Sequence, residues 1–138
     1  PSPADATDEY IKMFQDVNTK YNAGAVFDNN VLIGMNTAMM TVQALRAAGK
    51  NPTRASLMAG LAAKGSTFAS AAFSPIGYSA SSHVGYSGYW FGTYNSSGAM
   101  LPDGGKYVLY TTDSGAGDVV KSTYKRPAMP AKGLPNNS

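Results

Sequence analysis

The sequence has no cysteine, one histidine and few charged residues, and each shortage argues against a class of function. Without cysteine, the 138-residue chain has no disulfide framework, no thiol nucleophile and no thiolate metal site. A single histidine without clustered carboxylates gives zinc too few ligands. Long apolar runs are also missing, since none approaches the roughly 20 residues that a membrane-spanning helix needs.

Charged residues make up 14% of the chain, and the net charge of +3 is spread without a run of Lys or Arg. Nucleic-acid binding needs a concentrated basic face, so we predict no nucleic-acid partner. Hydrophobic residues make up 43%, which indicates a folded chain, and the length fits one domain. No cofactor and no metal are predicted.

The strongest periodicity lies between Asp28 and Gly49. Apolar residues recur there at helical spacing: Val31, Leu32, Met35, Ala38, Met39, Val42 and Leu45. Asp28 or Asn29 fits the start of this helix as a cap, and Gly49 fits its end. Thr53 is placed to cap a following helix, so the sequence predicts a helical hairpin with helices at about 29–48 and 53–64.

Another amphipathic helix is predicted at about residues 8–21, with Tyr10, Met13, Phe14, Val17 and Tyr21 on its apolar face. Strands are predicted at about 88–94 and 106–111, paired antiparallel, and a shorter one at 119–124. In the first strand, alternation puts Tyr89, Phe91 and Thr93 on one face, with Trp90 and Tyr94 on the other. The remaining tail is rich in loops and proline, and we expect it to be poorly ordered or laid along the surface.

Two segments carry a resemblance to a known family. The helix ending in Gln43-Ala-Leu-Arg-Ala-Ala-Gly-Lys-Asn-Pro-Thr-Arg-Ala-Ser-Leu57 resembles the C-terminal part of type I solute-binding proteins. These are the extracellular or periplasmic receptors of ABC importers, of the branched-chain-amino-acid class. The segment Phe73-Ser-Pro-Ile-Gly-Tyr-Ser-Ala-Ser-Ser-His-Val-Gly-Tyr-Ser-Gly-Tyr-Trp90 adds to the likeness, because the family has a similar Ser-x-His-x-Gly-Tyr segment after its helices. The likeness runs from about Thr7 to Asp113.

The resemblance implies an α/β fold. Residues 1–113 would be the C-terminal portion of a two-lobed type I periplasmic-binding-protein fold, a helical hairpin followed by a strand pair, and 114–138 a loop-rich tail. The whole protein would capture a small polar solute, such as an amino acid, in the cleft between its lobes. It would then deliver the solute to the membrane permease of an ABC importer. No bond chemistry is involved, so we predict that the chain is not an enzyme.

The junction before the central helix is the candidate ligand site. In the resembling family the start of this helix faces the cleft, which points to Phe27, Asp28, Asn29 and Asn30 as ligand-binding residues. A physical argument supports the same place, because helix N-termini present free amides to polar or anionic groups. Capping together with a core Phe explains the same residue types, and both interpretations stay open. Met35 stands where the family often has a large polar aromatic residue, so the resemblance does not define the shape of the pocket for the ligand's side chain.

The resemblance also implies partners and a location. Relatives in the family are longer, so we expect this chain to be a C-terminal fragment whose missing N-terminal part completes the ligand site. The alternative is a short mature protein whose leader has been removed. The implied location is extracellular or periplasmic, with a lipid anchor on the absent N-terminal part as one route of attachment. In the family, residues of the missing part mainly hold the amino and carboxyl groups of the ligand, so the resemblance implies weak or no amino-acid binding by the isolated chain. Apolar surface left bare by the missing part predicts self-association.

The residues alone are also compatible with other functions. A small secreted protein-interaction module that uses the aromatic strand 86–94 is the main alternative, because Tyr and Trp favour interfaces. A sensor domain of a signalling protein is a third. A serine hydrolase built on His83 lacks the Gly-x-Ser-x-Gly nucleophile turn, so this histidine is expected to be an ordinary hydrogen-bonding residue. The ligand's identity and the oligomeric state do not follow from the sequence.

Overall fold

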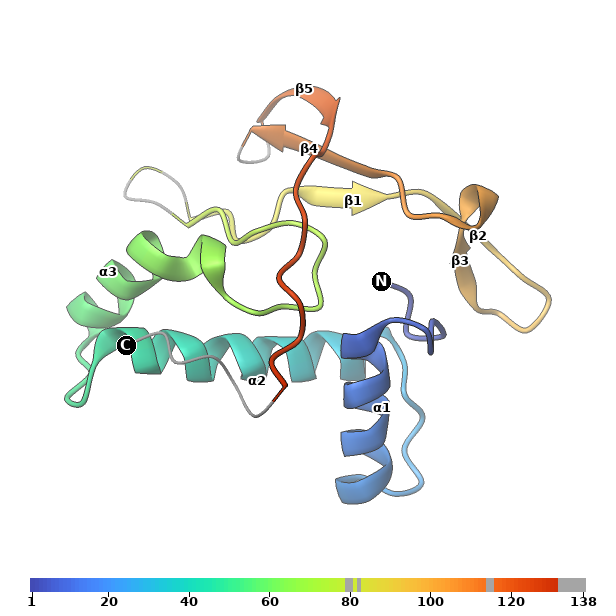
Figure 1. The fold of residues 1–138 in the computed structure, drawn as a ribbon, viewed down its shortest axis with the longest axis horizontal. Helices are drawn as coiled ribbons and strands as arrows, with labels where there is room; N and C mark the ends of the chain where they lie inside the picture. Colours follow the sequence, from blue (N-terminus) through green and yellow to red (C-terminus); the bar gives the residue numbers. More distant parts are fainter. Residues whose placement is uncertain (79–80, 82, 114–115, 132–138) are drawn as a thin grey trace.

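The chain has a mixed α/β architecture in a computed structural model that describes residues 1–78, 81, 83–113 and 116–131 (Figure 1). Three helices come first: α1 (Glu9–Tyr21), α2 (Asn29–Ala48) and α3 (Arg54–Lys64). Five short strands follow: β1 (Gly88–Trp90), β2 (Gly92–Tyr94), β3 (Met100–Pro102), β4 (Leu109–Asp113) and β5 (Ala116–Lys121). The three predicted helices are therefore confirmed, each within one residue of its predicted bounds.

Side-chain caps explain why the helices begin where they do. The Asp8 carboxylate accepts hydrogen bonds from the backbone N–H groups of the first turn of α1, and Asp28 accepts one from Val31 N in α2. Thr53 and Ser56 form a reciprocal capping box at the start of α3. Each cap satisfies amide groups that have no partner inside the helix, so these starts are fixed locally.

Helix α1 buries a face slightly different from the predicted one. Tyr10 and Phe14 are buried as predicted, and Ile11 joins them, whereas Tyr21 is 74% exposed. Asn18 is buried too, because its amide donates to Ala25 O at 3.0 Å and stabilises the turn after the helix. A satisfied amide can therefore take a core position that the apolar pattern assigned to its neighbours.

The core consists of two small clusters on α2. One joins α1 to α2 and includes Tyr10, Ile11, Phe14, Leu32 and Met39. The other joins α2 to α3 and includes Met40, Ala44 and Phe68. The loop from Phe68 to Ser74 contributes to both clusters, and most of its residues are buried. In the view of Figure 1 this loop lies between the helices and the sheet.

The strands form two antiparallel sheets. Strand β4 lies between β1 and β5, whereas among the described residues β2 pairs with β3 alone. The predicted antiparallel pairing of the two main strands is confirmed by the β1–β4 register, in which Tyr89 faces Tyr110. The prediction of one continuous strand at 88–94 is wrong, because the ladder breaks at Phe91 and its two halves belong to different sheets.

Glycine explains the change of partner after Phe91. A Cβ on Gly92 would contact the Trp90 ring and lie 2.5 Å from the carbonyl oxygen of Leu101. Only glycine allows this close approach of the two backbones, so β2 can leave the first sheet and pair with β3.

The second predicted strand, 106–111, begins late. Strand β4 starts at Leu109, and the chain before it returns from β3 through a tight turn at Gly104 and Gly105, which have φ values of 67° and 72°. Strand β3 itself was not predicted. Strand β5 begins earlier than the predicted 119–124, so part of the tail expected to be loop-rich is sheet.

The proline-rich segment 122–131, called the strap here, lies along the surface (Figure 1). This is one of the two arrangements predicted for the tail. Arg126 anchors it. Its guanidinium lies 2.6 Å from the Asp8 carboxylate, and both side chains are nearly buried, with 13% and 6% exposed. The same guanidinium lies over the rings of Tyr10 and Phe73 at 4.5 and 4.8 Å, which adds cation–π attraction. Residues 132–138, the end of the predicted tail, lie outside the described residues.

Candidate functional site

Two amide side chains of α2 hold the buried loop in place. Gln43 is fully buried, and its Nε2 donates to Ala69 O at 2.7 Å while its Oε1 accepts from Ala69 N at 2.8 Å. Two helical turns before Gln43, Asn36 Oδ1 accepts a hydrogen bond from Ala71 N at 2.7 Å. A buried loop must satisfy its backbone groups, and here the side chains do what a neighbouring strand would otherwise do.

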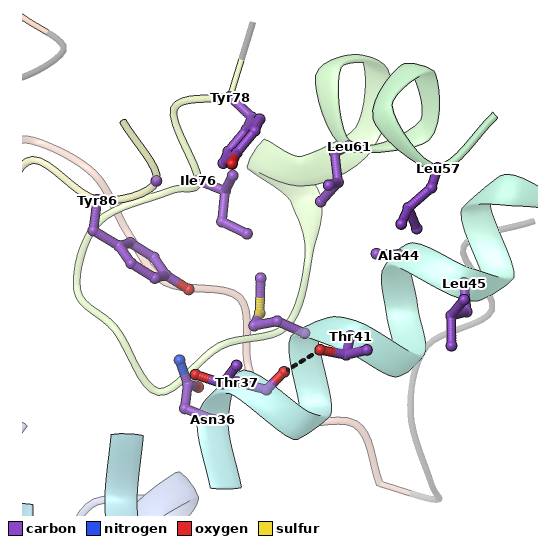
Figure 2. A pocket seen from close by; sticks show the side chains of 12 residues that line it. Asn36, Thr37, Thr41, Ala44, Leu45, Leu57, Leu61, Ile76, Tyr78 and Tyr86 are labelled. Carbon is purple, nitrogen blue, oxygen red and sulfur yellow. Dashed lines mark hydrogen bonds between the residues drawn. The ribbon is translucent and has the colours of Figure 1, made fainter. Parts of the chain in front are cut away.

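A first cavity of about 290 Å³ lies between α2, α3 and the segment from Ile76 to Tyr86 (Figure 2). Its apolar lining comes from Met40, Ala44, Leu45, Leu57, Leu61 and Ile76. Thr37, Thr41 and Asn36 line it from α2, and Tyr78 and Tyr86 line it from the opposite side.

A second cavity of about 400 Å³ continues along α2 toward its N-terminus. It is lined by Leu32, Ile33, Ala71 and Ala72, and it shares three residues with the first cavity: Asn36, Thr37 and Tyr86. We call the two cavities together the α2 groove. Each is close to the lower limit of small-molecule sites in proteins, which hold roughly 300–1,000 Å³.

A small hydrogen-bond network stands where the two cavities meet. The Tyr86 hydroxyl lies 3.1 Å from Ser70 Oγ. Ser70 Oγ also accepts from Ala72 N at 3.0 Å and from Asn36 Nδ2 at 3.2 Å. In Figure 2 the Tyr86 hydroxyl points toward Asn36 and Thr37, across the groove from α3.

The groove is electrically neutral. Among the described residues, no Asp, Glu, Lys, Arg or His lines either cavity. The backbone amine of Pro1 borders the second cavity, and burial lowers its pKa to about 6. A charged ligand would meet no charged side chain among these lining residues.

The four predicted ligand residues lie outside the groove. Asp28, Asn29 and Asn30 are exposed at the start of α2, where the Asp28 carboxylate accepts from Val31 N at 2.9 Å. Phe27 is half-buried against the cluster that joins α1 to α2. The structure thus brings the four together at one helix end, with Asp28 acting as its cap, and their contact with a ligand remains a prediction.

Sequence reasoning missed the residues of the groove. Asn36 and Gln43 interrupt the apolar pattern of α2 seven residues apart, which places them on the same side of the helix two turns away from each other. That spacing is the signal that would have found them. Ser70 and Tyr86 carry no such signal, because loops bring them to the helix.

Aromatic residues form two clusters on the sheet. In the first cluster, the ring centre of Phe91 lies 5.9 Å from that of Tyr89 and 5.7 Å from that of Tyr110, and Phe91 is 63% exposed. In the second cluster, the ring centres of Trp90 and Tyr107 are 4.9 Å apart. The predicted division is therefore present for Tyr89, Phe91 and Trp90, whereas Thr93 and Tyr94 belong to the other sheet.

His83 is exposed, and its ring stacks on Tyr78 with the centres 5.4 Å apart. Within the described residues, no group of three His, Asp or Glu side chains is placed to hold a metal ion. None of the helices in that part of the chain is both long and apolar enough to cross a membrane.

Comparisons of the chain with protein-family models, curated proteins and solved structures found no match.

Proposed function

We propose that this chain is the C-terminal portion of an extracellular or periplasmic solute-binding component of an ABC importer. The whole protein would be a two-lobed receptor of the type I class that closes around a small solute, an amino acid by default, and delivers it to a membrane permease. Closure works because the ligand binds the closed state better than the open one. The chain would act by capture and release, without making or breaking bonds.

The start of α2 is the observation that carries this proposal, because Asp28, Asn29 and Asn30 are exposed there together. A helix N-terminus presents free amides and a positive dipole to polar or anionic groups of a solute. The α2 groove has no charged side chain among its described lining residues and is not the site proposed here.

The amount of exposed surface supports the idea of a portion of a larger body. The chain exposes 8600 Å² at a mass of 14.4 kDa. A compact monomer of that mass exposes roughly 6,800 Å². Part of the excess is apolar and lies on α2, where Ile33 is 63% and Leu45 43% exposed. A second lobe, or a second copy of the chain, would cover such residues.

The test compares this chain with the product of the whole coding region that contains it, in a thermal-shift screen of amino acids and related solutes. The whole product should be stabilised by at least one of them, and the isolated chain should respond weakly or not at all. Micromolar amino-acid binding by the chain alone would overturn the view that its site is incomplete.

Matched cap variants in the whole product test the predicted helix-start contacts. Asp28→Ala and Thr53→Ala each remove one N-cap, so each should cost about 0.5–2 kcal/mol of stability. Only Asp28→Ala should also weaken solute binding. If the two variants bind equally well, Asp28 is a cap and nothing more.

The second candidate is a small secreted interaction module that uses the aromatic strand 86–94. Exposed Phe91 and Tyr94, at 63% and 62%, are the observation in its favour, because exposed aromatic residues are enriched at interfaces. A coding region that begins near Pro1 would favour this module, and a long upstream coding region would favour the receptor.

A further inference from the structure

We infer that the α2 groove binds a neutral, mainly apolar small molecule that carries one hydrogen-bond-accepting oxygen, and that the Tyr86 hydroxyl meets this oxygen where the two cavities join. The site lies wholly within this chain and needs no second lobe. The inference therefore goes beyond the proposed function, in which a solute is held between lobes.

The donors and acceptors around Ser70 Oγ indicate that the Tyr86 hydroxyl keeps a proton to donate. A serine hydroxyl has one proton to donate and two lone pairs to accept. Ser70 Oγ uses its lone pairs for Ala72 N and Asn36 Nδ2, at 3.0 and 3.2 Å. Its own proton is then directed to Tyr86 at 3.1 Å, which is nearer than Asn36 Oδ1 at 3.3 Å, where Ala71 N takes one of the two lone pairs.

In this arrangement the Tyr86 oxygen accepts from Ser70, and its own O–H remains available. Within the described part of the chain, Ser70 is the hydrogen-bond partner that the structure gives to this hydroxyl. Tyr86 lines both cavities, and in Figure 2 its hydroxyl points toward Asn36 and Thr37, which also line both. A carbonyl, ether or alcohol oxygen in the groove would accept this proton.

The residues that line the α2 groove indicate the chemistry of the rest of the ligand. With no charged side chain among the described lining residues, a zwitterion would leave its ammonium and carboxylate groups unpaired away from water, which is costly. Apolar side chains lie on both sides of Tyr86: Leu57 and Leu61 in one cavity, and Leu32 and Ile33 in the other. Apolar groups on either side of the oxygen would fill this space.

The experiment titrates the isotope-labelled chain with three probes of similar size and follows backbone amide shifts by NMR. Acetophenone carries the acceptor oxygen, ethylbenzene lacks it, and phenylalanine is zwitterionic. Acetophenone should give saturable shifts in α2 and near Tyr86. Tyr86→Phe keeps the ring and removes the donor, so it should weaken acetophenone binding about threefold to tenfold and leave ethylbenzene unchanged.

A pair of tryptophan variants locates the site. Thr37 is exposed and lines both cavities, so Thr37→Trp should abolish binding of both apolar probes. Ala38 is exposed and lines neither cavity, so Ala38→Trp should bind as the unaltered chain does. If Thr37→Trp unfolds the chain, the Tyr86→Phe comparison still decides the matter.

Several results would overturn the inference. These are no saturable shift with acetophenone, equal weakening of acetophenone and ethylbenzene by Tyr86→Phe, or phenylalanine binding as tight as acetophenone. Groove amides that shift with protein concentration alone would show a second copy in the groove instead. Solute capture by the whole gene product with a silent groove would overturn this inference and leave the proposed function standing. Probe binding in the groove without solute capture by the whole gene product would support this inference and overturn the proposed function.

Discussion

Replacing Gln43 tests whether an amide side chain really holds the buried loop to α2. The Gln43→Met variant keeps the length of the side chain and removes both hydrogen bonds to Ala69. Gln43 is 0% and Ala69 1% exposed, so water cannot replace the lost partner without opening the loop.

The expected loss follows from the two groups left unpaired. A buried donor or acceptor without a partner costs about 1–3 kcal/mol, and here one N–H and one C=O are affected. The methionine side chain recovers part of this, because it buries no polar amide of its own. We therefore expect the free energy of unfolding to fall by about 2–4 kcal/mol.

Urea unfolding followed by far-UV circular dichroism at pH 7 measures this loss. Ala38→Met is the matched control, because it introduces the same side chain on the exposed face of α2 and should stay within about 0.5 kcal/mol of the original. A loss below about 1 kcal/mol in Gln43→Met, equal to the control, would refute the view that this amide replaces a strand.

Gln43→Glu adds a pH dependence of known sign. The new carboxyl can donate to Ala69 O only when it is protonated, and burial also raises its pKa above the ordinary value of about 4.3. The variant should therefore be closest to the original below pH 4 and lose stability as the pH rises through the raised pKa of the folded state. Unchanged relative stability between pH 4 and pH 7 would contradict the assigned hydrogen bond.

Three further predictions concern the strap, the glycines and a tyrosine. Arg126→Leu should lower the free energy of unfolding, measured in urea, by about 3–5 kcal/mol, because it removes the ion-pair partner of the nearly buried Asp8 carboxylate. Arg126→Lys should lower it less, and equal stability of both variants with the original would count against the anchor. Gly34→Ala should stabilise by about 0.5–1 kcal/mol, since nothing lies within 4 Å of the added Cβ, whereas Gly92→Ala should destabilise through its clash with the Leu101 carbonyl. Burial raises the pKa of Tyr107 to about 12, so stability that is present below pH 10 should be lost as the pH rises toward 12. Tyr107→Phe should remove this part of the alkaline loss, and an unchanged urea midpoint profile between pH 9 and 11 would refute it.

The helices could be predicted because their determinants are local. Asp8, Asp28 and Thr53 each satisfy amides two or three residues away, and the apolar period is contained within each helix. Tertiary contacts altered the buried faces of α1 and α2. In α1 the satisfied amide of Asn18 took a core position, and in α2 Gln43 is buried whereas the predicted Val42 and Leu45 are exposed.

The strands were predicted less well because their partners are distant. Alternation from Gly88 to Tyr94 is compatible with one strand, and nothing local indicates that the carbonyl of Leu101 approaches Gly92. The choice between one sheet and two depends on that approach. The late start of β4 has the same origin, since the turn at Gly104 and Gly105 must first bring the chain back from β3.

The groove was missed for a related reason. Its central contacts join Asn36 to Ser70, 34 residues apart, and Ser70 to Tyr86, 16 residues apart. Small residues around Ser70 predicted only a loop. They give no sign that this loop is buried, because burial is made possible by amides on another element.

Stability and the candidate site depend on the same helix, and they share only some of its residues. Asn36 belongs to both, since its Oδ1 holds the loop at Ala71 N while the residue lines both cavities. A change at Asn36 would therefore lower stability and alter the groove together, and its effect on binding would have no single cause. Thr37 is exposed on the helix, and Tyr86 is 40% exposed with Ser70 as its hydrogen-bond partner in the described chain. Ser70 can turn its proton to Asn36 Oδ1, 3.3 Å away, when Tyr86 loses its hydroxyl. Changes at Thr37 and Tyr86 should for this reason alter binding while the loop stays in place, which makes them the residues through which the groove's function can be separated from its fold.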